Sequence, residues 1–308
     1  MAADGQPTWV EVEGRELRLS NLHKVLYPSA GLTKAAVVDY YARIAPVLLP
    51  HIAGRPMTLK RYPDGVDAEY FYEKNCPGHR PDWVVTARVP SGRSAGGYID
   101  FCVVEDVPTL VWVANLASLE LHPYLHRAPD LDRPTTVVFD LDPGEPAGLL
   151  EAAQVALDVR GLLDELDLES VVKTSGGKGI QVYLPLNSSV GYEDTGGFAR
   201  ALAQLLERGA PDRVVANMRK DLRAGKVLVD WSQNNAHKTT VGVYSLRARA
   251  RPTVSSPLRW SEVEAAVEAG DASSLVFEYD DVLERVEASG DLFRPVLDTV
   301  QELPTLRS

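Results

Sequence analysis

A strand that ends in two aspartates one residue apart constrains this chain more than any other feature of its sequence. Residues 135–141 are mostly β-branched or apolar, as in a buried strand, and a turn sequence follows at 142–144. Because successive strand side chains point to opposite faces, Asp140 and Asp142 share one face, while their apolar neighbours enter the core. Two carboxylates this close repel each other unless a cation lies between them. The pattern predicts either a divalent-ion site or a solvated strand end with an ordinary turn.

A third acid and a glycine-rich loop favour the ion site. Asp230 ends another β-branched run, at 227–229, and can reach the same point from a neighbouring strand. Mg²⁺ and Mn²⁺ prefer oxygen ligands, and three carboxylates around two ions roughly 4 Å apart suit phosphoryl transfer. The loop at 175–179, Ser-Gly-Gly-Lys-Gly, offers backbone N–H groups, a hydroxyl and an ammonium to a triphosphate. A plain hairpin turn is the alternative for this loop.

Strands and helices interleave around these residues. Apolar residues recur at helical spacing across 149–166 and 198–206, whereas 170–174, 180–184 and 227–231 have the pattern of short strands. The fold class expected is α/β or α+β, with a mixed catalytic β-sheet flanked by helices. The other elements expected are a hairpin at 9–19, a helix capped by Thr33, a strand at 57–62, a buried helix at 109–121, and a late helix with a capping box of Ser261 and Glu264.

Charge is distributed unevenly along the 308 residues, whose net charge is −11. Residues 15–61 and 219–251 each hold eight basic side chains against two acidic ones, whereas 262–302 hold twelve acidic against two basic. This pattern favours a polyanion site on one face. The alternative is that basic and acidic segments simply neighbour each other in space.

Three features that the sequence lacks indicate where in the cell the protein is expected. No apolar run approaches the roughly 20 residues needed to cross a bilayer, and the first 13 residues lack the pattern of a secretory signal. Cys76 and Cys102 are too few for a disulfide scaffold, and together with His79 they lack a fourth zinc ligand. We therefore expect a cytoplasmic protein with no membrane partner.

Several longer blocks of sequence occur in a fixed order. They are Leu19–Pro28, Val138–Gly144, Thr174–Gly179, Arg223–Lys226, Val229–Asn234, Lys238–Thr240 and Tyr244–Arg247. Together they resemble the polymerase module of the bacterial end-joining ligase D, a branch of the archaeo-eukaryotic primase superfamily, over about residues 17–259. The resemblance implies a primase-like fold. It also implies a DNA repair polymerase that adds nucleotides, often ribonucleotides, to a primer 3′-end at gaps or breaks.

The resemblance also implies roles for individual residues. The catalytic ligands of two Mn²⁺ or Mg²⁺ ions would be Asp140, Asp142 and Asp230. The residues expected around the nucleoside triphosphate (NTP or dNTP) are His122, Ser175, Lys178, Gln181, Arg223, Lys238 and Arg247. A 5′-phosphate would be recognised by Lys24 and Lys34, with Lys60 on the same duplex-binding surface. Template bases would stack on Phe71 and Tyr72.

The chain departs from the family pattern at Gln181 and at its end. Primase-type loops place histidine where Gln181 stands, and Gln181 can donate a hydrogen bond to a phosphate but carries no charge. No ligase or nuclease module follows before Ser308. We therefore expect a stand-alone, nucleoid-associated bacterial enzyme. Its expected partners are gapped or broken DNA with a 5′-phosphate, a separately encoded ligase and Ku, in end joining or gap filling.

Two other functions fit parts of the pattern. A haloacid-dehalogenase-like phosphatase would use Asp140 as nucleophile and Asp142 as acid, but residues 143–145 lack the Thr or Val that should follow its motif. A non-catalytic DNA-end-binding protein would not need the three acids. On the polymerase interpretation, residues 1–308 form a single domain. Its parts are a DNA-binding region at about 9–130, a catalytic core at about 131–260 and an acidic helical extension at about 261–308.

Overall fold

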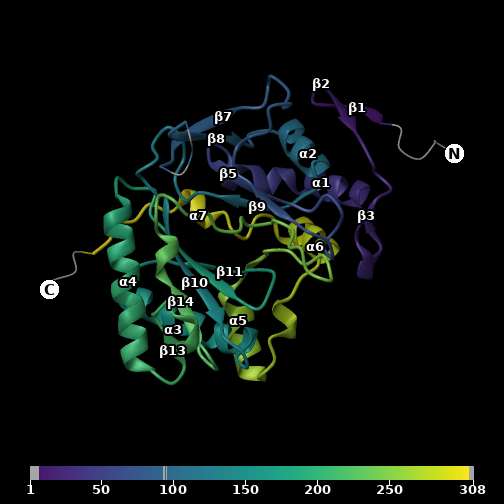
Figure 1. The fold of residues 1–308 in the computed structure, drawn as a ribbon. Helices are drawn as coiled ribbons and strands as arrows, with labels where there is room; N and C mark the ends of the chain where they lie inside the picture. Colours follow the sequence, from purple (N-terminus) through teal and green to yellow (C-terminus); the bar gives the residue numbers. More distant parts are fainter. Residues whose placement is uncertain (1–6, 93, 95, 305–308) are drawn as a thin grey trace.

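Two larger sheets organise the residues that the computed structural model describes, which are 7–92, 94 and 96–304. Residues 1–6, part of the stretch that lacks a secretory signal, lie outside them. Figure 1 shows a six-stranded sheet in the lower half of the molecule and a sheet built from the N-terminal segments in the upper half. The last two helices, α6 (Tyr279–Ser289) and α7 (Pro295–Asp298), lie between the two halves. This is the mixed α/β architecture expected from the sequence.

The six-stranded sheet carries the acid pair. In spatial order its strands are β13 (Val214–Val215), β14 (Val227–Asp230), β10 (Thr136–Pro143), β12 (Ile180–Pro185), β11 (Val171–Thr174) and β15 (Pro257–Leu258). Among them β13 and β14 run parallel, and the other neighbours are antiparallel. Strand β10 alternates as predicted: Val137, Phe139 and Leu141 are fully buried against one face, and the acids lie on the other.

Three helices cover the apolar face of this sheet. They are α3 (Leu149–Asp164), α4 (Tyr192–Gly209) and α5 (Trp260–Ala269). The expected capping box of α5 is wrong by two residues, because the helix begins directly after β15. Glu262 accepts the backbone N–H of Arg259 at 2.7 Å, and Glu264 instead pairs with Arg160 at 2.7 Å.

The N-terminal sheet is centred on β5 (Pro56–Arg61). Its other strands are β6 (Phe71–Glu73), β7 (Thr86–Pro90), β8 (Tyr98–Val103) and β9 (Ser118–Pro123). The helices α1 (Lys34–Ile52) and α2 (Val107–Asn115) pack against each other beside it. Two small hairpins precede α1, namely β1 (Thr8–Val12) with β2 (Arg15–Leu19) and β3 (Val25–Tyr27) with β4 (Leu32–Thr33). The predicted first hairpin and the Thr33 cap, which accepts the N–H of Ala36 at 3.4 Å, are confirmed.

The predicted helix at 109–121 is correct only as far as Asn115. Ala117 has a φ of +57°, which reverses the chain, and β9 begins at the next residue. In β9, Leu121 stands opposite Leu59 of β5, so its apolar side chains are buried by sheet pairing rather than by a helix face. An apolar run of this length fits either element until its partner strand is known.

The acidic C-terminal segment belongs to both halves of the molecule. Val282 of α6 (Tyr279–Ser289) and Val296 of α7 (Pro295–Asp298) join the N-terminal core, whereas Val263 of α5 joins the core of the catalytic sheet. Asp291 accepts hydrogen bonds from Tyr244 at 2.7 Å and pairs with His51 at 2.8 Å. The segment therefore ties the two sheets together.

Short turns and one cross-link complete the fold. The 3₁₀ turns are η1 (Pro28–Ala30), η2 (Lys220–Leu222), η3 (Trp231–Gln233) and η4 (Ser273–Leu275). Cys76 and Cys102 form a disulfide, with a Cα–Cα distance of 4.8 Å, that ties the segment after β6 to β8. The sequence-based expectation of a cytosolic chain did not foresee this bond. Across the described residues, every helix is too short or too polar to cross a bilayer.

Candidate active site

The three predicted acids stand on one face of the catalytic sheet. Asp140 of β10 is the direct partner of Asp230 on β14 and of Gln181 on β12. Directly opposed residues share a face, with Cβ atoms about 5 Å apart, and Asp142 lies two residues further along the same face. Burial and, to a smaller extent, the charges of Asp230 and Asp142 together raise the pKa of Asp140 to about 6, against the hydrogen bond from Gln181.

Each of these carboxylates is held by a different protein group. Asp230 caps the η3 turn by accepting the N–H of Ser232 at 2.9 Å, and the Gln233 amide donates to it at 3.2 Å. Asp142 lies 3.8 Å from the guanidinium of Arg223. In the part of the chain that the structure describes, no three His, Cys, Asp or Glu side chains are gathered closely enough to hold a metal ion. The shared face is as expected, but the three side chains do not converge on one point.

The glycine-rich loop is a hairpin turn between β11 and β12, and it closes over the end of β10. Ser175 donates its N–H to the Gly179 carbonyl at 2.9 Å. A Cβ at Gly179 would lie 2.6 Å from the carbonyl oxygen of Leu141, so only glycine fits there. Arg247 donates to the carbonyl of Ser175 and holds the loop from the other side. Exposed Lys178 pairs with Glu145 at 3.1 Å.

Sequence reasoning missed a buried carboxylate, Glu120 of β9. It contacts His122 and Arg247, which were expected around the nucleotide, and Lys60, which was expected on the duplex-binding surface. His122 lies 2.9 Å from Glu120, the Arg247 guanidinium 3.4 Å and the Lys60 ammonium 3.5 Å. The backbone N–H of Ala248 also donates to it, at 3.1 Å. Glu120 therefore links the N-terminal sheet to the glycine-rich loop through Arg247.

Electrostatics explain how an acid with a 2% exposed side chain stays charged there. Burial alone would raise the pKa of Glu120, but the hydrogen bond from His122 and the charges of Arg247 and Lys60 outweigh it and hold the pKa well below its usual range. Burial also lowers the pKa of His122, against the attraction of Glu120. The sequence signal for Glu120 is weak, because a single Glu within an apolar run is equally typical of a strand or helix with one solvent-facing position.

The remaining candidates fall into two groups. Lys238 donates to the hydroxyl of Ser232, which in turn hydrogen-bonds Asp230, so this lysine lies beside the acids. The rings of Phe71 and Tyr72 on β6 are 44% and 54% exposed, and Tyr72 lies edge-on to His122 with ring centroids 6.3 Å apart. Tyr72 thus adjoins the Glu120 cluster, whereas Phe71 lies on the side of Arg61, whose guanidinium is 5.1 Å from the centre of its ring.

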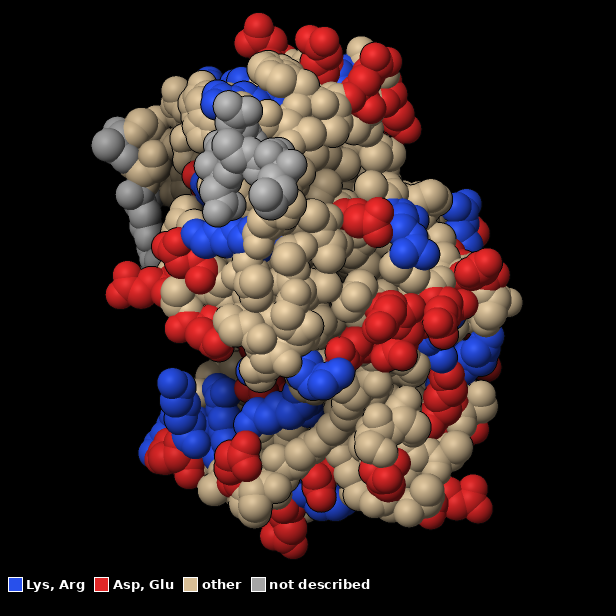
Figure 2. Space-filling view, turned by 90° about the vertical axis from the view of Figure 1, so that its right-hand side faces the viewer, with Lys and Arg blue, Asp and Glu red and all other residues tan. Residues whose placement is uncertain are grey.

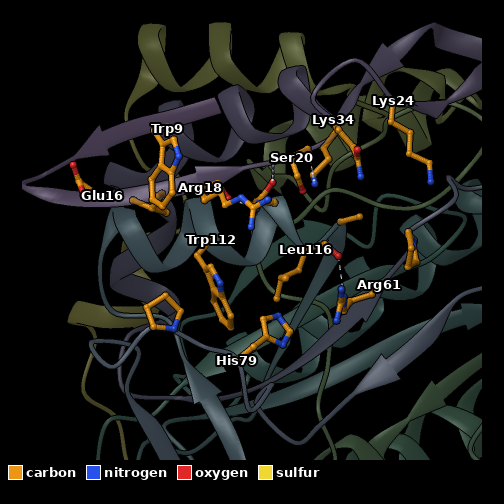
Figure 3. A pocket seen from close by; sticks show the side chains of 16 residues that line it. Trp9, Glu16, Arg18, Ser20, Lys24, Lys34, Arg61, His79, Trp112 and Leu116 are labelled. Atoms are coloured by element: carbon orange, nitrogen blue, oxygen red, sulfur yellow. Dashed lines mark hydrogen bonds between the residues drawn. The ribbon is translucent and has the colours of Figure 1, made fainter. Parts of the chain in front are cut away.

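A separate basic cavity lies on the N-terminal half, with a volume of about 640 Å³. Figure 3 shows Lys24, Lys34 and Arg61 lining it. The Lys34 ammonium donates to the carbonyl of Ser20 at 2.7 Å, and Lys24 pairs with Asp64 at 2.5 Å. Burial and, to a smaller extent, the charges of Lys24 and Arg61 together lower the pKa of Lys34 to about 8.

Lys60 does not line this cavity, although the sequence grouped it with Lys24 and Lys34. Its ammonium lies 4.3 Å from the centre of the Tyr70 ring, on the side of Glu120. Arg61, its neighbour in β5, points to the opposite face and lines the cavity. Strand alternation alone predicts that Lys60 and Arg61 point to opposite faces of β5. Which of the two faces the cavity becomes clear only in the folded sheet.

Basic and acidic side chains lie close together at several places on the face that Figure 2 shows. Figure 2 shows basic side chains gathered beside a hollow in the lower half of one face, next to a band of acidic ones. Several cations of the basic segment are nevertheless paired with acids from elsewhere: Arg15 with Asp106, at 2.6 Å, and Arg61 with Glu73, at 2.7 Å. Counts along the sequence therefore overstate the free positive charge.

Relatives of known sequence cover most of this chain. The chain is 43% identical over 290 residues to the multifunctional non-homologous end joining protein LigD of Mycolicibacterium smegmatis, an alignment that covers 94% of this chain and 37% of that protein. It is 31% identical over 290 residues to the bifunctional non-homologous end joining protein LigD of Bacillus subtilis, covering 94% of this chain and 45% of that one. The chain thus spans less than half the length of these relatives.

A solved structure and a family model cover most of the chain. The polymerase domain from Mycobacterium tuberculosis ligase D in complex with DNA superposes with a TM-score of 0.85 and 40% identity, over 92% of this chain and 99% of that one. The model of the family described as LigD, primase-polymerase domain, matches residues 33–293. The chain belongs to the LigD primase-polymerase domain family.

Proposed function

We propose that this protein adds nucleotides to the 3′-end of a DNA primer at gaps or breaks, as a nucleotidyltransferase. One observation carries the proposal: Asp140 pairs directly with Asp230 across two neighbouring strands, and Asp142 lies two residues after Asp140 on the same face. The glycine-rich loop closes over this end of the strand. An α-phosphate held there would meet acids on one side and the cations around Glu120 on the other.

The donor chemistry of this face fits divalent ions. Asp140, Asp142 and Asp230 would hold them, once Asp142 and Asp230 turn from Arg223 and from the η3 turn. Oxygen ligands suit Mg²⁺ and Mn²⁺, and the mutual repulsion that raises the pKa of Asp140 is relieved by a cation. Two such ions supply activation of the attacking oxygen and support for the leaving group.

The protein's own residues bind and orient the substrates. Ser175 and Lys178, with Arg247 behind the loop, would hold the triphosphate, and Lys238 and Arg223 lie at the acid end. Phe71 and Tyr72 offer exposed rings for stacking on template bases. Lys24 and Lys34 would bind the 5′-phosphate, because an anion relieves the repulsion among the cations of their cavity.

The relatives are named for non-homologous end joining, and one solved relative was determined with DNA. On this basis we infer that the chain acts in DNA break or gap repair. A DNA ligase activity would then seal the product, with Ku as the candidate end-binding partner.

A primer-extension assay tests the proposal against both alternatives. The substrate is a labelled primer on a duplex with a gap and a 5′-phosphate, with Mn²⁺ and ribonucleoside triphosphates. Lengthening of the primer is the expected result. Release of phosphate without lengthening would favour the phosphatase, and a mobility shift without chemistry would favour a DNA-end-binding protein.

A further inference from the structure

Four polar residues form a straight row across four strands of the catalytic sheet. Lys173 on β11 pairs directly with Gln181 on β12, Gln181 pairs with Asp140 on β10, and Asp140 pairs with Asp230 on β14. All four side chains therefore share one face. The row runs from a cation through an amide to two of the acids that would hold the metal ions.

Lys173 occupies an unusual position for a lysine. Its side chain is 0% exposed, and its ammonium donates to Gln181 Oε1 at 2.5 Å, to Ser255 Oγ at 2.6 Å and to the Val241 carbonyl at 3.2 Å. All three acceptors are uncharged. A buried ammonium without a directly bonded carboxylate costs stability, so packing alone gives no reason to keep it.

Gln181 has no hydrogen left for a nucleotide. Its side chain is 2% exposed, and Nε2 donates to Asp140 Oδ1 at 3.0 Å and to Thr240 Oγ1 at 2.9 Å. An amide nitrogen carries two hydrogens, and both are used. If the amide turned over, its oxygen would face the Asp140 carboxylate and its NH₂ would face the ammonium of Lys173, which are two repulsive contacts.

We propose that Lys173 and Gln181 are positioning residues for Asp140. The Lys173 ammonium fixes the orientation of the Gln181 amide, and the amide then holds the Asp140 carboxylate in place through Nε2. The inference rests on the proposed polymerase function and changes the role expected for Gln181, from a nucleotide contact to a support beneath the acids. The sequence could not show this, because the pairing of Lys173 with Gln181 depends on the register of β11 and β12.

The first test measures the amide itself and does not depend on activity. In ¹⁵N-labelled protein, the Gln181 side-chain NH₂ signals are identified by their loss in Gln181→Glu. We expect these hydrogens to be protected from exchange in the wild type, and to exchange at least about tenfold faster in Lys173→Met. Ser255→Ala, which removes another partner of the same ammonium, is the matched control and should leave the protection in place. Unchanged protection in Lys173→Met would overturn the proposal.

The second test separates positioning from nucleotide binding in primer extension. Lys173→Met and Gln181→Glu should each lower kcat about 10- to 100-fold and leave the KM for the nucleotide within about twofold. A raised KM with unchanged kcat would instead make Gln181 a nucleotide contact. If Lys173→Met does not fold, Gln181→Glu still decides, because it keeps an acceptor for Lys173 and replaces the amide donor to Asp140 by a carboxylate oxygen, which repels that acid.

A double-variant cycle completes the design. A histidine ring donates without needing a lysine to orient it, so Lys173→Met should cost far less in a Gln181→His background than in the wild type. Equal losses in both backgrounds would show a merely structural role for Lys173 and overturn the proposal. A wild type without polymerase activity would refute the proposed function alone, because the exchange measurement still tests the Lys173–Gln181 pair.

Discussion

The two charged sites of the molecule are built in opposite ways. The acids of the catalytic sheet stand at paired positions of hydrogen-bonded strands, so the backbone ladder fixes their spacing. The basic cavity takes Lys24 from a loop, Lys34 from the start of α1 and Arg61 from the end of β5. Its cations are held by side-chain and carbonyl contacts at its margin. Backbone pairing therefore fixes the spacing of the first site, whereas contacts of individual side chains hold the second together.

Both sites nevertheless follow one electrostatic rule. Burial and neighbouring acids raise the pKa of Asp140 to about 6, while burial and neighbouring cations lower the pKa of Lys34 to about 8. Each site therefore disfavours its own charge, and a ligand of opposite sign relieves that cost. The comparison teaches that the protein has one site suited to cations and a separate one suited to an anion.

The largest expected effect comes from the acidic site. Asp140→Asn should lower primer extension by more than about 1,000-fold, since several kcal/mol of transition-state stabilisation depend on the metal ligands. The same variant should keep its preference for 5′-phosphorylated gaps, measured by DNA binding. Asp164→Asn, an exposed acid on α3, is the control and should extend primers normally. Loss of both properties in Asp140→Asn would show that the two sites are not independent.

The link between the two halves is the next target. Glu120→Gln should lower the free energy of unfolding by about 3 kcal/mol at pH 7, because it leaves Arg247 and Lys60 without their buried counter-charge. The folded-state pKa of Glu120 is depressed, so its stabilisation is fully present above about pH 4.3 and is lost as the pH falls below that value. Urea unfolding of the wild type and of Glu120→Gln should show a smaller difference in the free energy of unfolding at pH 3 than at pH 7.

A surface pair provides the control for that experiment. Glu264 is a half-exposed residue of α5 that pairs with Arg160. Glu264→Gln removes this pair and should change the free energy of unfolding by less than about 1 kcal/mol at either pH. If the wild type and Glu120→Gln have the same free energy of unfolding at pH 7, Glu120 does not stabilise the contact between the two halves.

The basic cavity should show a smaller effect. Replacement of both Lys24 and Lys34 by alanine should reduce the preference for a 5′-phosphorylated over an unphosphorylated gap by roughly 10- to 100-fold, as expected for lost hydrogen bonds to a charged group. Competition binding with the two duplexes measures it. Arg43→Ala, an exposed cation on α1, should leave the preference unchanged. An undiminished preference in the double variant would place the 5′-phosphate elsewhere.

The exposed aromatic strand should show the smallest effect. Phe71→Leu or Tyr72→Leu should weaken binding of a template overhang by about 1 kcal/mol, the usual order for one stacked base. Tyr98→Leu, an exposed ring on β8, is the matched control. The loss should disappear on an overhang with abasic sites, which offer no base for stacking. A loss that persists there would assign the rings to the DNA backbone.

The sequence predicted the acidic site better than the basic one for a physical reason. The spacing of Asp140 and Asp142 and the shape of the 175–179 loop are local, and strand alternation alone puts the two acids on one face. The separation of Lys60 from Lys24 and Lys34 depends on which way β5 faces, and this appears only in the folded sheet. Local sequence patterns therefore predict the acidic residues of the catalytic strand, but they do not predict which residues line the basic cavity.

The residues that sequence reasoning missed depend on contacts with other elements of the fold. Glu120 and Lys173 lie in apolar runs, and their roles follow from partners outside their own strands: Arg247 for Glu120, and Gln181 with Ser255 for Lys173. The helix expected through Leu121 failed in the same way, because pairing of β9 with β5 overrides its local pattern. Cross-strand register, which no single segment encodes, decides all three.

Manganese binding to the acid face tests the account most directly. Electron paramagnetic resonance counts free Mn²⁺ during a titration, with and without a nucleoside triphosphate, in the wild type and in Asp230→Asn. Asp221→Asn, an exposed acid in the η2 turn, is the control. The wild type and the control should bind Mn²⁺, and Asp230→Asn should bind it at least about tenfold more weakly. Equal binding by all three proteins would contradict the assignment of these carboxylates as metal ligands.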